Sequence, residues 1–305
     1  MLQWGEIIFG LLLGLLILPA LHYLQQPDPQ PPARMPSPDR DPTPPPSPIL
    51  NTISTPYDEN EIVDLITELY ELLVKLACFP PDEVTWPPEP GHQINEVLCE
   101  ELHLDPAVTS LMKKLPYLDS DLRGQVHLFP GSEPYSFLKD GDILESRDPE
   151  NLPPRPGKES KLRLDYLLPH DVALAHNLRY GMTLVLDTKD NTVRMLDSAD
   201  SPDYVNPEGT VLERPDDPNH YRNYYTQHAP SYIRRLIEKI QKLELIPAGT
   251  QGLGREYHGN EDAEVRDEVK KILIEAYGWP DDFRQEDWAR DMEEVWDTAI
   301  RRATD

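Results

Sequence analysis

The sequence predicts an α+β protein in which helices pack on a small antiparallel sheet. Apolar residues recur at helical spacing after residue 57 and again after residue 230. Between these two regions lie three short runs of strand-forming residues, separated by turn residues. Helices that precede and follow a group of strands, and do not alternate with them, are typical of this class.

The chain divides by composition into four predicted segments. They are a transmembrane anchor (1–26), a disordered Pro-rich linker (27–56), an α+β domain (57–250) and a C-terminal helical hairpin (251–305).

The anchor prediction depends on Ile7–Leu24, which contains no charged residue. As a helix it is about 27 Å long, close to the thickness of the hydrocarbon core, and Trp4 and Tyr23 supply interfacial rings. A cleaved signal peptide would have a positive start and a small-x-small cleavage site, and neither is found here. We therefore expect an anchor that is retained in the bilayer. A cleaved signal and a core helix are the alternatives.

Basic residues near the anchor predict its orientation. Arg34 and Arg40 follow the apolar run and no Lys or Arg precedes it, so the C-terminal domain is expected in the cytoplasm. The sequence has no Asn-x-Ser/Thr sequon, which agrees with this. Pro27–Pro48 holds eleven prolines in twenty-two residues and predicts a polyproline II spacer. The run "PTPPPSP" leaves open a ligand for a proline-binding module.

The first predicted helix begins after Asp58, with Glu61 completing a capping box, and ends before Pro80. Its apolar face comprises Ile62, Leu65, Ile66, Leu69, Leu72, Leu73 and Leu76. The stretch "INEVLCEELHLDPAVTSLMKKLPYL" predicts two shorter helices separated at Asp105-Pro106, an N-cap followed by a first-turn proline.

Three runs predict an antiparallel meander: Val172–His176, Met182–Asp187 and Thr192–Leu196. The polar residues 188–191 suit a hairpin turn between the last two. The segments "QVHLFPG" and "KLRLDYL" are further strand predictions.

The remaining helices lie toward the C-terminus. "PSYIRRLIEKIQKLELIP" predicts a helix with Pro230 in its first turn. Two more helices follow, the first stopped by Gly278 and the second carrying Trp288 and Trp296 on one side. They form the predicted hairpin, which either docks on the domain or binds a partner.

The charge balance limits the classes of partner. The chain has 55 acidic and 29 basic residues, a formal net charge of -26. Such an excess repels phosphate backbones, so we expect no nucleic-acid partner. The acidic excess indicates a self-repelling, solvated surface, and the alternative is that it recognises a basic protein partner.

No catalytic or ligand-binding motif stands out in the sequence, so no cofactor, metal site or catalytic residue is predicted. Cys78 and Cys99 lie among apolar residues and are expected to be free thiols. His170 and His176 are six apart, but without a third ligand they are interpreted as ordinary strand-end histidines. The glycines of "GTQGLG" follow a helix and are interpreted as a linker.

Several stretches give the chain a resemblance to known proteins. "INEVLCEELHLDPAVTSLMKKLPYL", "MTLVLDTKDNTVRMLDSADSPDY", "SYIRRLIEKIQKLELIPAG" and "EAYGWPDDFR" resemble a group of poorly characterised fungal proteins over about residues 60–285. The order of early helices, meander and amphipathic helix is more remotely similar to the SUKH superfamily. That superfamily includes toxin-immunity proteins and a cell-wall synthesis regulator. The resemblance implies an α+β binding module and assigns no functional residue.

The function expected from these features is a membrane-tethered acidic interaction or scaffold domain without catalysis. Its partners would be the bilayer, through Ile7–Leu24, and a protein. The candidate partner surface comprises Trp86, Tyr221, Tyr224 and Tyr225. The alternative is an enzyme or accessory factor of a membrane-associated fungal biosynthetic pathway, acting in a pocket beside the meander.

Overall fold

A computed structural model describes nine stretches of the chain, all within its second compact unit. Contacts divide the chain into Met1–Ser47 and Pro48–Asp305. The described residues are 55–118, 127–129, 132–151, 162–177, 182–197, 220–224, 226–247, 257–258 and 263–304. The predicted anchor lies outside them, as does nearly all of the predicted linker. Within these stretches, no helix has both the length and the apolar character needed to cross a bilayer.

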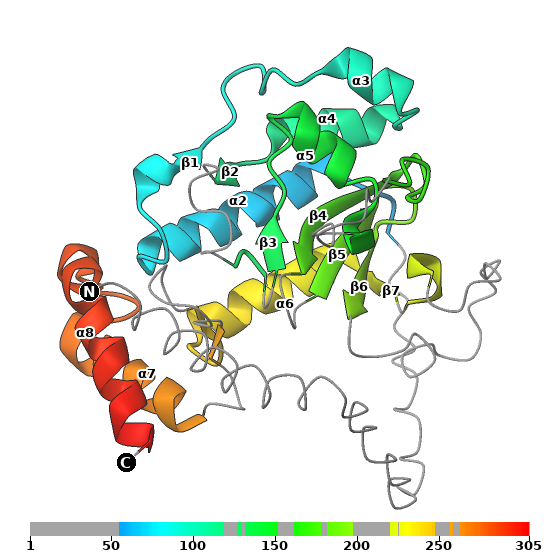
Figure 1. The fold of residues 1–305 in the computed structure, drawn as a ribbon. Helices are drawn as coiled ribbons and strands as arrows, with labels where there is room; N and C mark the ends of the chain where they lie inside the picture. Colours follow the sequence, from blue (N-terminus) through cyan, green and yellow to red (C-terminus); the bar gives the residue numbers. More distant parts are fainter. Residues whose placement is uncertain are drawn as a thin grey trace, which may run out of the picture. The chain divides into compact units, whose positions relative to one another are not determined.

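The α+β class is confirmed, with a five-stranded antiparallel sheet at its centre (Figure 1). The strand order is β3-β4-β5-β6-β7, so each strand pairs with its neighbours along the chain. The strands are β3 (Ser132–Pro134), β4 (Asp171–Asn177), β5 (Met182–Asp187), β6 (Thr192–Asp197) and β7 (Thr226–His228). The predicted meander is β4–β6, and the turn at 188–191 joins β5 to β6 as expected.

The register of the sheet separates apolar and polar side chains onto two faces. Val172 pairs with Leu186 and Leu186 with Val193, which places these buried apolar side chains on one face. Asp171 pairs with Asp187, and Val185 with Arg194, so three charged side chains belong to the other face. All three are buried, which makes this second face the unusual one.

Two long helices, α2 (Glu59–Lys75) and α6 (Ala229–Gln241), run behind the sheet side by side (Figure 1). Asp58 caps α2 by accepting hydrogen bonds from the amides of Asn60 and Glu61. Each helix buries an apolar stripe at helical spacing, and Arg234 of α6 pairs with Glu61 of α2 at 2.8 Å. Pro230 lies in the first turn of α6, as predicted.

Shorter elements surround this core. They are η1 (Pro81–Glu83), β1 (Val84–Thr85), α3 (Glu96–Glu101), α4 (Pro106–Lys114), β2 (Tyr117–Leu118), α5 (Asp140–Glu145), η3 (Pro149–Asn151), η5 (Tyr221–Asn223), β8 (Ile246–Pro247) and β9 (Tyr257–His258). The two predicted helices at Asp105-Pro106 are α3 and α4, and Asp105 caps α4 by accepting from the Ala107 amide. Cys78 and Cys99 are buried free thiols, as expected.

One strand prediction is wrong, and a second is only partly met. The described residues of "KLRLDYL" form turns and no strand. The Arg147 guanidinium binds the carbonyls of Leu167 and Leu168, so these groups are not available to a strand ladder. In "QVHLFPG", the described residues contribute only an isolated bridge from Phe129 to Ser132.

The C-terminal helices α7 (Ala263–Tyr277) and α8 (Gln285–Thr304) pack against each other and against the core. The Trp288 indole donates to the Leu76 carbonyl at 2.8 Å, and the Trp279 indole donates to the Gln241 carbonyl at 2.9 Å. Trp288 and Trp296 are almost fully buried, and burial of a large aromatic side chain stabilises a fold by a few kcal/mol. The pair is therefore docked on the ends of α2 and α6.

We predict that Gly278→Ala destabilises the docked hairpin. Gly278 follows α7 with φ +76°, and an added Cβ would lie 2.5 Å from the Asp282 carbonyl oxygen. Strain of this kind costs about 1–3 kcal/mol, so the free energy of unfolding should fall by about that amount in denaturant titrations of the full chain. The matched control is Gly141→Ala in α5, where a Cβ has nothing within 4 Å. Equal stability of both variants would contradict the prediction.

Candidate functional site

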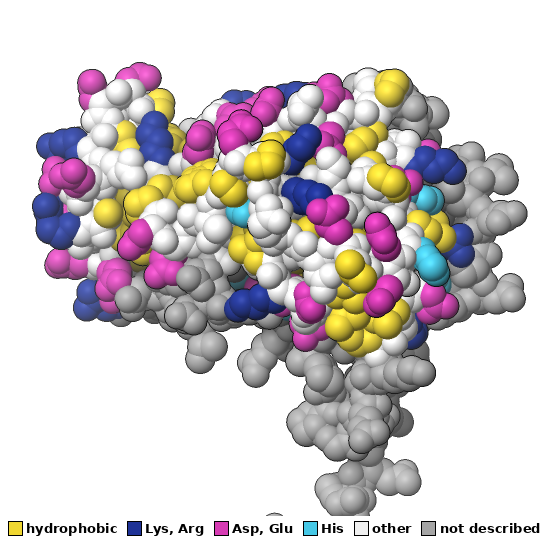
Figure 2. Space-filling view, turned by 90° about the horizontal axis from the view of Figure 1, so that it is seen from above, with side chains coloured by type: hydrophobic (Ala, Val, Ile, Leu, Met, Phe, Trp, Pro, Cys, Tyr) yellow, Lys and Arg dark blue, Asp and Glu magenta, His cyan; other side chains and the backbone are white. Residues whose placement is uncertain are grey.

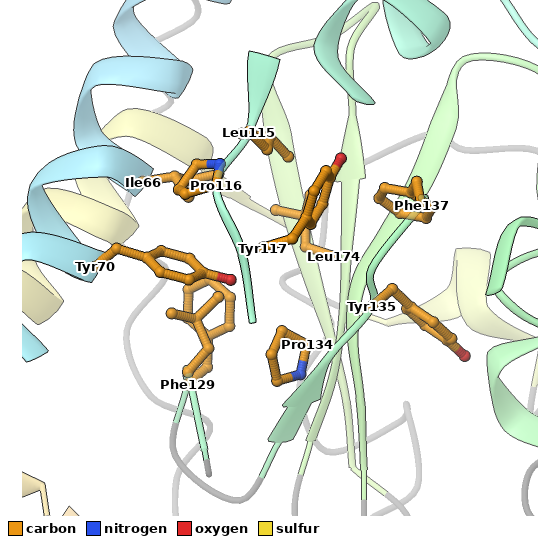
Figure 3. Close-up of a pocket in the computed structure, with 11 residues that line it drawn as sticks. Ile66, Tyr70, Leu115, Pro116, Tyr117, Phe129, Pro134, Tyr135, Phe137 and Leu174 are labelled. Carbon is orange, nitrogen blue, oxygen red and sulfur yellow. The ribbon is translucent and has the colours of Figure 1, made fainter. Parts of the chain in front are cut away.

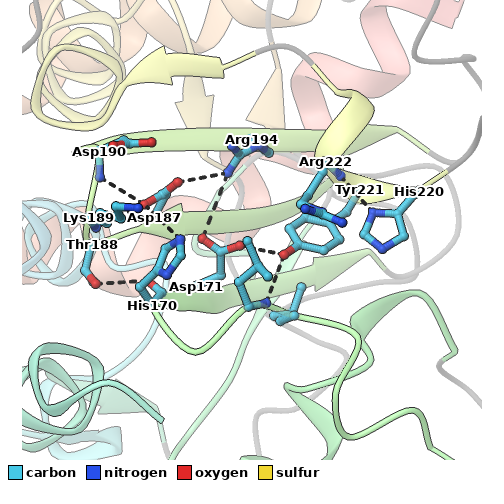
Figure 4. Close-up of polar contacts among 12 residues, drawn as sticks. His170, Asp171, Asp187, Thr188, Lys189, Asp190, Arg194, His220, Tyr221 and Arg222 are labelled. Atoms are coloured by element: carbon cyan, nitrogen blue, oxygen red, sulfur yellow. Dashed lines mark hydrogen bonds and ion pairs between the residues drawn. The ribbon is translucent and has the colours of Figure 1, made fainter. Parts of the chain in front are cut away.

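The polar face of the sheet carries a cluster of buried ionisable side chains (Figure 4). Asp171 is the first residue of β4 and Asp187 is the last residue of β5. The strands are antiparallel and the two residues are direct Cα partners, so their carboxylates share one face. Asp171 is fully buried and Asp187 is only 2% exposed. We call Asp171, Asp187, His170 and Arg194 the acidic cluster.

The β5–β6 turn fixes the Asp187 carboxylate. Its Oδ1 accepts hydrogen bonds from the amides of Lys189 and Asp190, both at 3.0 Å. An aspartate that caps the turn following its own strand is a common local motif. Its Oδ2 lies 3.4 Å from Arg194 Nη1, the nearest cationic group. Turn formation and charge compensation therefore use different oxygens of the same carboxylate.

Asp171 has one satisfied and one unsatisfied oxygen. The Tyr221 hydroxyl donates to Oδ2 at 2.6 Å, and the same hydroxyl accepts from the Leu168 amide at 2.9 Å. Oδ1 is buried and accepts no hydrogen bond from any described residue, and Arg194 Nη1 lies 4.0 Å from it. Burial, reinforced by the charge of Asp187, raises the pKa of Asp171.

His170 completes the acidic cluster at its accessible side. Its Nε2 lies 3.9 Å from Asp187 Oδ1, and its side chain is 22% exposed. One ligand atom from each of His170, Asp171 and Asp187 lies within 4.8 Å of the others. His176 lies at the opposite end of β4, beside Glu133, with a register shift in between. The two histidines therefore do not meet.

Arg147 holds the segment that leads into β4. It is 2% exposed and donates to the carbonyls of Asp171 (2.9 Å), Leu168 (3.2 Å) and Leu167. Burial lowers its pKa, but a guanidinium that donates to three carbonyls keeps its proton at neutral pH. Neither Arg147 nor Arg194 was expected at a site, because an isolated arginine carries no sequence signal.

The hollow beside the meander is too small to be a substrate site. It encloses about 10 Å³, at most the room for one water molecule. Figure 3 shows its lining, in which Tyr70 of α2, Tyr117, Phe129 and Phe137 converge. Tyr117 and Phe137 pack edge-to-face with their centroids 5.9 Å apart. This is a packed aromatic core and gives no support to an enzyme pocket here.

The predicted partner surface of Trp86, Tyr221, Tyr224 and Tyr225 is not assembled in the described residues. Trp86 is 39% exposed and packs edge-on against Tyr70. Tyr221 is fully buried, because its hydroxyl binds Asp171, and Tyr224 is 8% exposed. Tyr225 lies outside the described residues. Tyr221 and Tyr224 were expected to face solvent, but both side chains are buried.

A second, open hollow lies where α2, α6 and the α7–α8 connection meet. It encloses about 360 Å³ and is lined by Glu68, Glu71, Leu72, Lys75, Gln241, Trp279 and Pro280. The Lys75 ammonium lies 4.9 Å from the centroid of the Trp279 ring, a cation–π distance. We call this hollow the acidic groove, because two exposed carboxylates form its α2 wall.

No protein-family model, curated protein or solved structure matches the chain significantly. The resemblance to fungal proteins and to the SUKH superfamily therefore stays a prediction.

We predict that Tyr221→Phe weakens the fold through Asp171. The substitution leaves a buried carboxylate oxygen and the Leu168 amide without partners, which costs about 1–3 kcal/mol. Thermal and denaturant unfolding of the full chain measure the loss. Tyr57→Phe is the control, because the Tyr57 hydroxyl is buried and has no partner in the described residues. A Tyr221→Phe variant as stable as that control would contradict the role of this hydrogen bond.

Proposed function

We propose that the chain is a membrane-tethered, non-catalytic module whose α2 helix docks a basic segment of a partner protein. The observation that carries this proposal is an acidic ridge on α2, formed by Asp64, Glu68 and Glu71. The three residues follow the i, i+4, i+7 spacing, so they lie on one face of the helix. All three are exposed.

The ridge has little intramolecular compensation. Within the described stretches, no basic side chain forms an ion pair with Asp64, Glu68 or Glu71. Glu61, one turn earlier, already pairs with Arg234, and Glu68 accepts only a neutral hydrogen bond from Gln241 at 3.2 Å. No described residue therefore neutralises the charge of the ridge, which supports a role in binding an external cation.

The acidic groove offers apolar surface beside the ridge, on which a partner side chain can pack. Glu68 and Glu71 belong to both, and Leu72, Trp279 and Pro280 line the groove beside them. A lysine or arginine side chain can pack its aliphatic stem on such surfaces while its charged end meets a carboxylate. The partner expected is a helix with basic residues at i, i+4 and i+7, which span about 10 Å.

The face seen in Figure 2 carries a mixture of charges. Figure 2 shows Asp and Glu side chains spread over the face seen from above, interspersed with basic and apolar side chains. Other acidic side chains form ion pairs within the protein. Asp148 pairs with Arg163 at 2.6 Å, and Asp287 pairs with Arg290 at 3.0 Å. This distribution supports specific docking at the ridge over general attraction by net charge.

The binding test uses the full chain in detergent and a labelled peptide with Lys or Arg at i, i+4 and i+7. The triple variant Asp64→Lys, Glu68→Lys, Glu71→Lys should bind at least about tenfold more weakly, since three exposed ion pairs at about 0.2–1 kcal/mol each are replaced by repulsion. Fluorescence anisotropy at several salt concentrations measures the affinity, which should fall as salt rises.

The matched control is the triple variant Glu100→Lys, Glu293→Lys, Glu294→Lys. It changes the net charge equally at exposed positions on α3 and α8. An equal loss of binding in this control would mean that net charge, and not the ridge, determines the affinity. Failure of the wild-type chain to bind the peptide at low salt would overturn the proposal.

The tether is tested separately. The uncharged run Ile7–Leu24 supports an anchor, so we expect the chain to stay in the membrane pellet after alkaline carbonate extraction and a chain lacking residues 7–24 to be released. Protease added outside sealed microsomes should digest the C-terminal domain if it faces the cytoplasm. Release of the intact chain by carbonate would contradict the anchor.

A further inference from the structure

We infer that His170, Asp171 and Asp187 form a binding site for one first-row divalent metal ion, with Zn²⁺ as the representative case. The three side chains converge from the start of β4 and the end of β5 (Figure 4). One ligand atom from each lies within 4.8 Å of the others. An imidazole nitrogen and two carboxylate oxygens are a donor set that zinc sites use when a fourth position is left for water.

The unsatisfied oxygen of Asp171 is the independent observation. Asp171 is fully buried, and its Oδ1 accepts no hydrogen bond from the described residues. A buried carboxylate oxygen without a partner is costly, and such groups call for a specific explanation. In Figure 4 the Asp171 oxygen on the dashed line to Arg194, which is Oδ1, lies on the side of His170, so a cation bound between the three side chains would satisfy it.

The spacing of one pair of ligands is close to what a metal needs, and all three ligand atoms lie within 4.8 Å of one another. Ligands about 2.1 Å from a tetrahedral ion lie about 3.4 Å from one another. His170 Nε2 and Asp187 Oδ1 are 3.9 Å apart, so a shift of well under 1 Å brings them to that spacing. His170 is the partly exposed member, so it can make this adjustment and offers the ion a path from solvent.

The neighbours of the ligands already hold them in orientation. The amides of Lys189 and Asp190 fix Asp187, and the Tyr221 hydroxyl fixes Asp171 through its other oxygen. Such supporting hydrogen bonds are typical around metal ligands. Arg194 is the competing cation, but its Nη1 is nearer to Asp187 Oδ2 than to the unsatisfied oxygen of Asp171.

The donor set also selects among ions. Imidazole nitrogen favours Zn²⁺ and neighbouring first-row metals, whereas Mg²⁺ and Ca²⁺ prefer oxygen ligands only and a higher coordination number. We therefore expect Zn²⁺ to bind and Mg²⁺ not to displace it. This inference does not depend on the acidic ridge, which lies on α2.

The test is isothermal titration of ZnCl2 into the full, metal-free chain in detergent, with the thermal midpoint of unfolding as a second readout. We expect one high-affinity site per chain and a raised midpoint. His170→Gln should weaken this binding by tenfold or more, because it removes a ligand. Among the described residues, the only polar contact of the His170 side chain is the long one to Asp187, so this variant should fold.

The matched control is His176→Gln, which changes a histidine beside a single carboxylate at the other end of the same strand. Zinc binding that survives in the control and is lost in His170→Gln supports the site. Equal loss in both variants, no loss in His170→Gln, or no stoichiometric binding by the wild-type chain overturns it. Displacement of bound Zn²⁺ by millimolar MgCl2 would also overturn the assignment of the ion class.

Discussion

The fold depends on how it compensates two carboxylates that face each other inside it. Asp171 and Asp187 are direct partners on neighbouring strands, and both are buried. Like charges placed opposite each other destabilise a sheet, and buried charges need partners. Arg194 from β6 and Tyr221 from η5 supply them, so a third strand and a distant loop are both required at this point. The Tyr221 hydroxyl also holds the Leu168 amide, and the Arg147 guanidinium holds the Leu168 carbonyl.

This arrangement explains why the tyrosine loop is part of the interior. The Tyr221 hydroxyl is the hydrogen-bond donor to Asp171, and its ring packs against Tyr166 at 5.3 Å. Without Tyr221, Asp171 Oδ2 would lose its hydrogen-bond donor. The polar face therefore serves stability and is the site at which we propose that a cation binds, while α2 carries the surface on which a partner is proposed to dock.

The local elements were predictable where a short stretch determines them. Asp58 and Asp105 cap helices that start as expected, and Gly278 ends α7 because its φ is positive. The meander was predictable because alternating and β-branched runs are separated by turn residues. "KLRLDYL" was mispredicted because Arg147, a residue outside that stretch, binds the carbonyl of its last residue, Leu167, and that of the following Leu168. The site was harder to predict than the strands, because Arg194 and Tyr221 contact Asp171 from positions later in the chain.

The sequence alone determined the α+β class, the helix caps, the three-stranded meander and the strong acidic excess, because each follows from neighbouring residues or from composition. Only the tertiary structure decided that Tyr221 and Tyr224 are buried and that Trp288 donates to Leu76 from 212 residues away. The same holds for the convergence of His170, Asp171 and Asp187. Their proximity depends on strand register, and register is set by the packing of the whole sheet, which no single segment encodes.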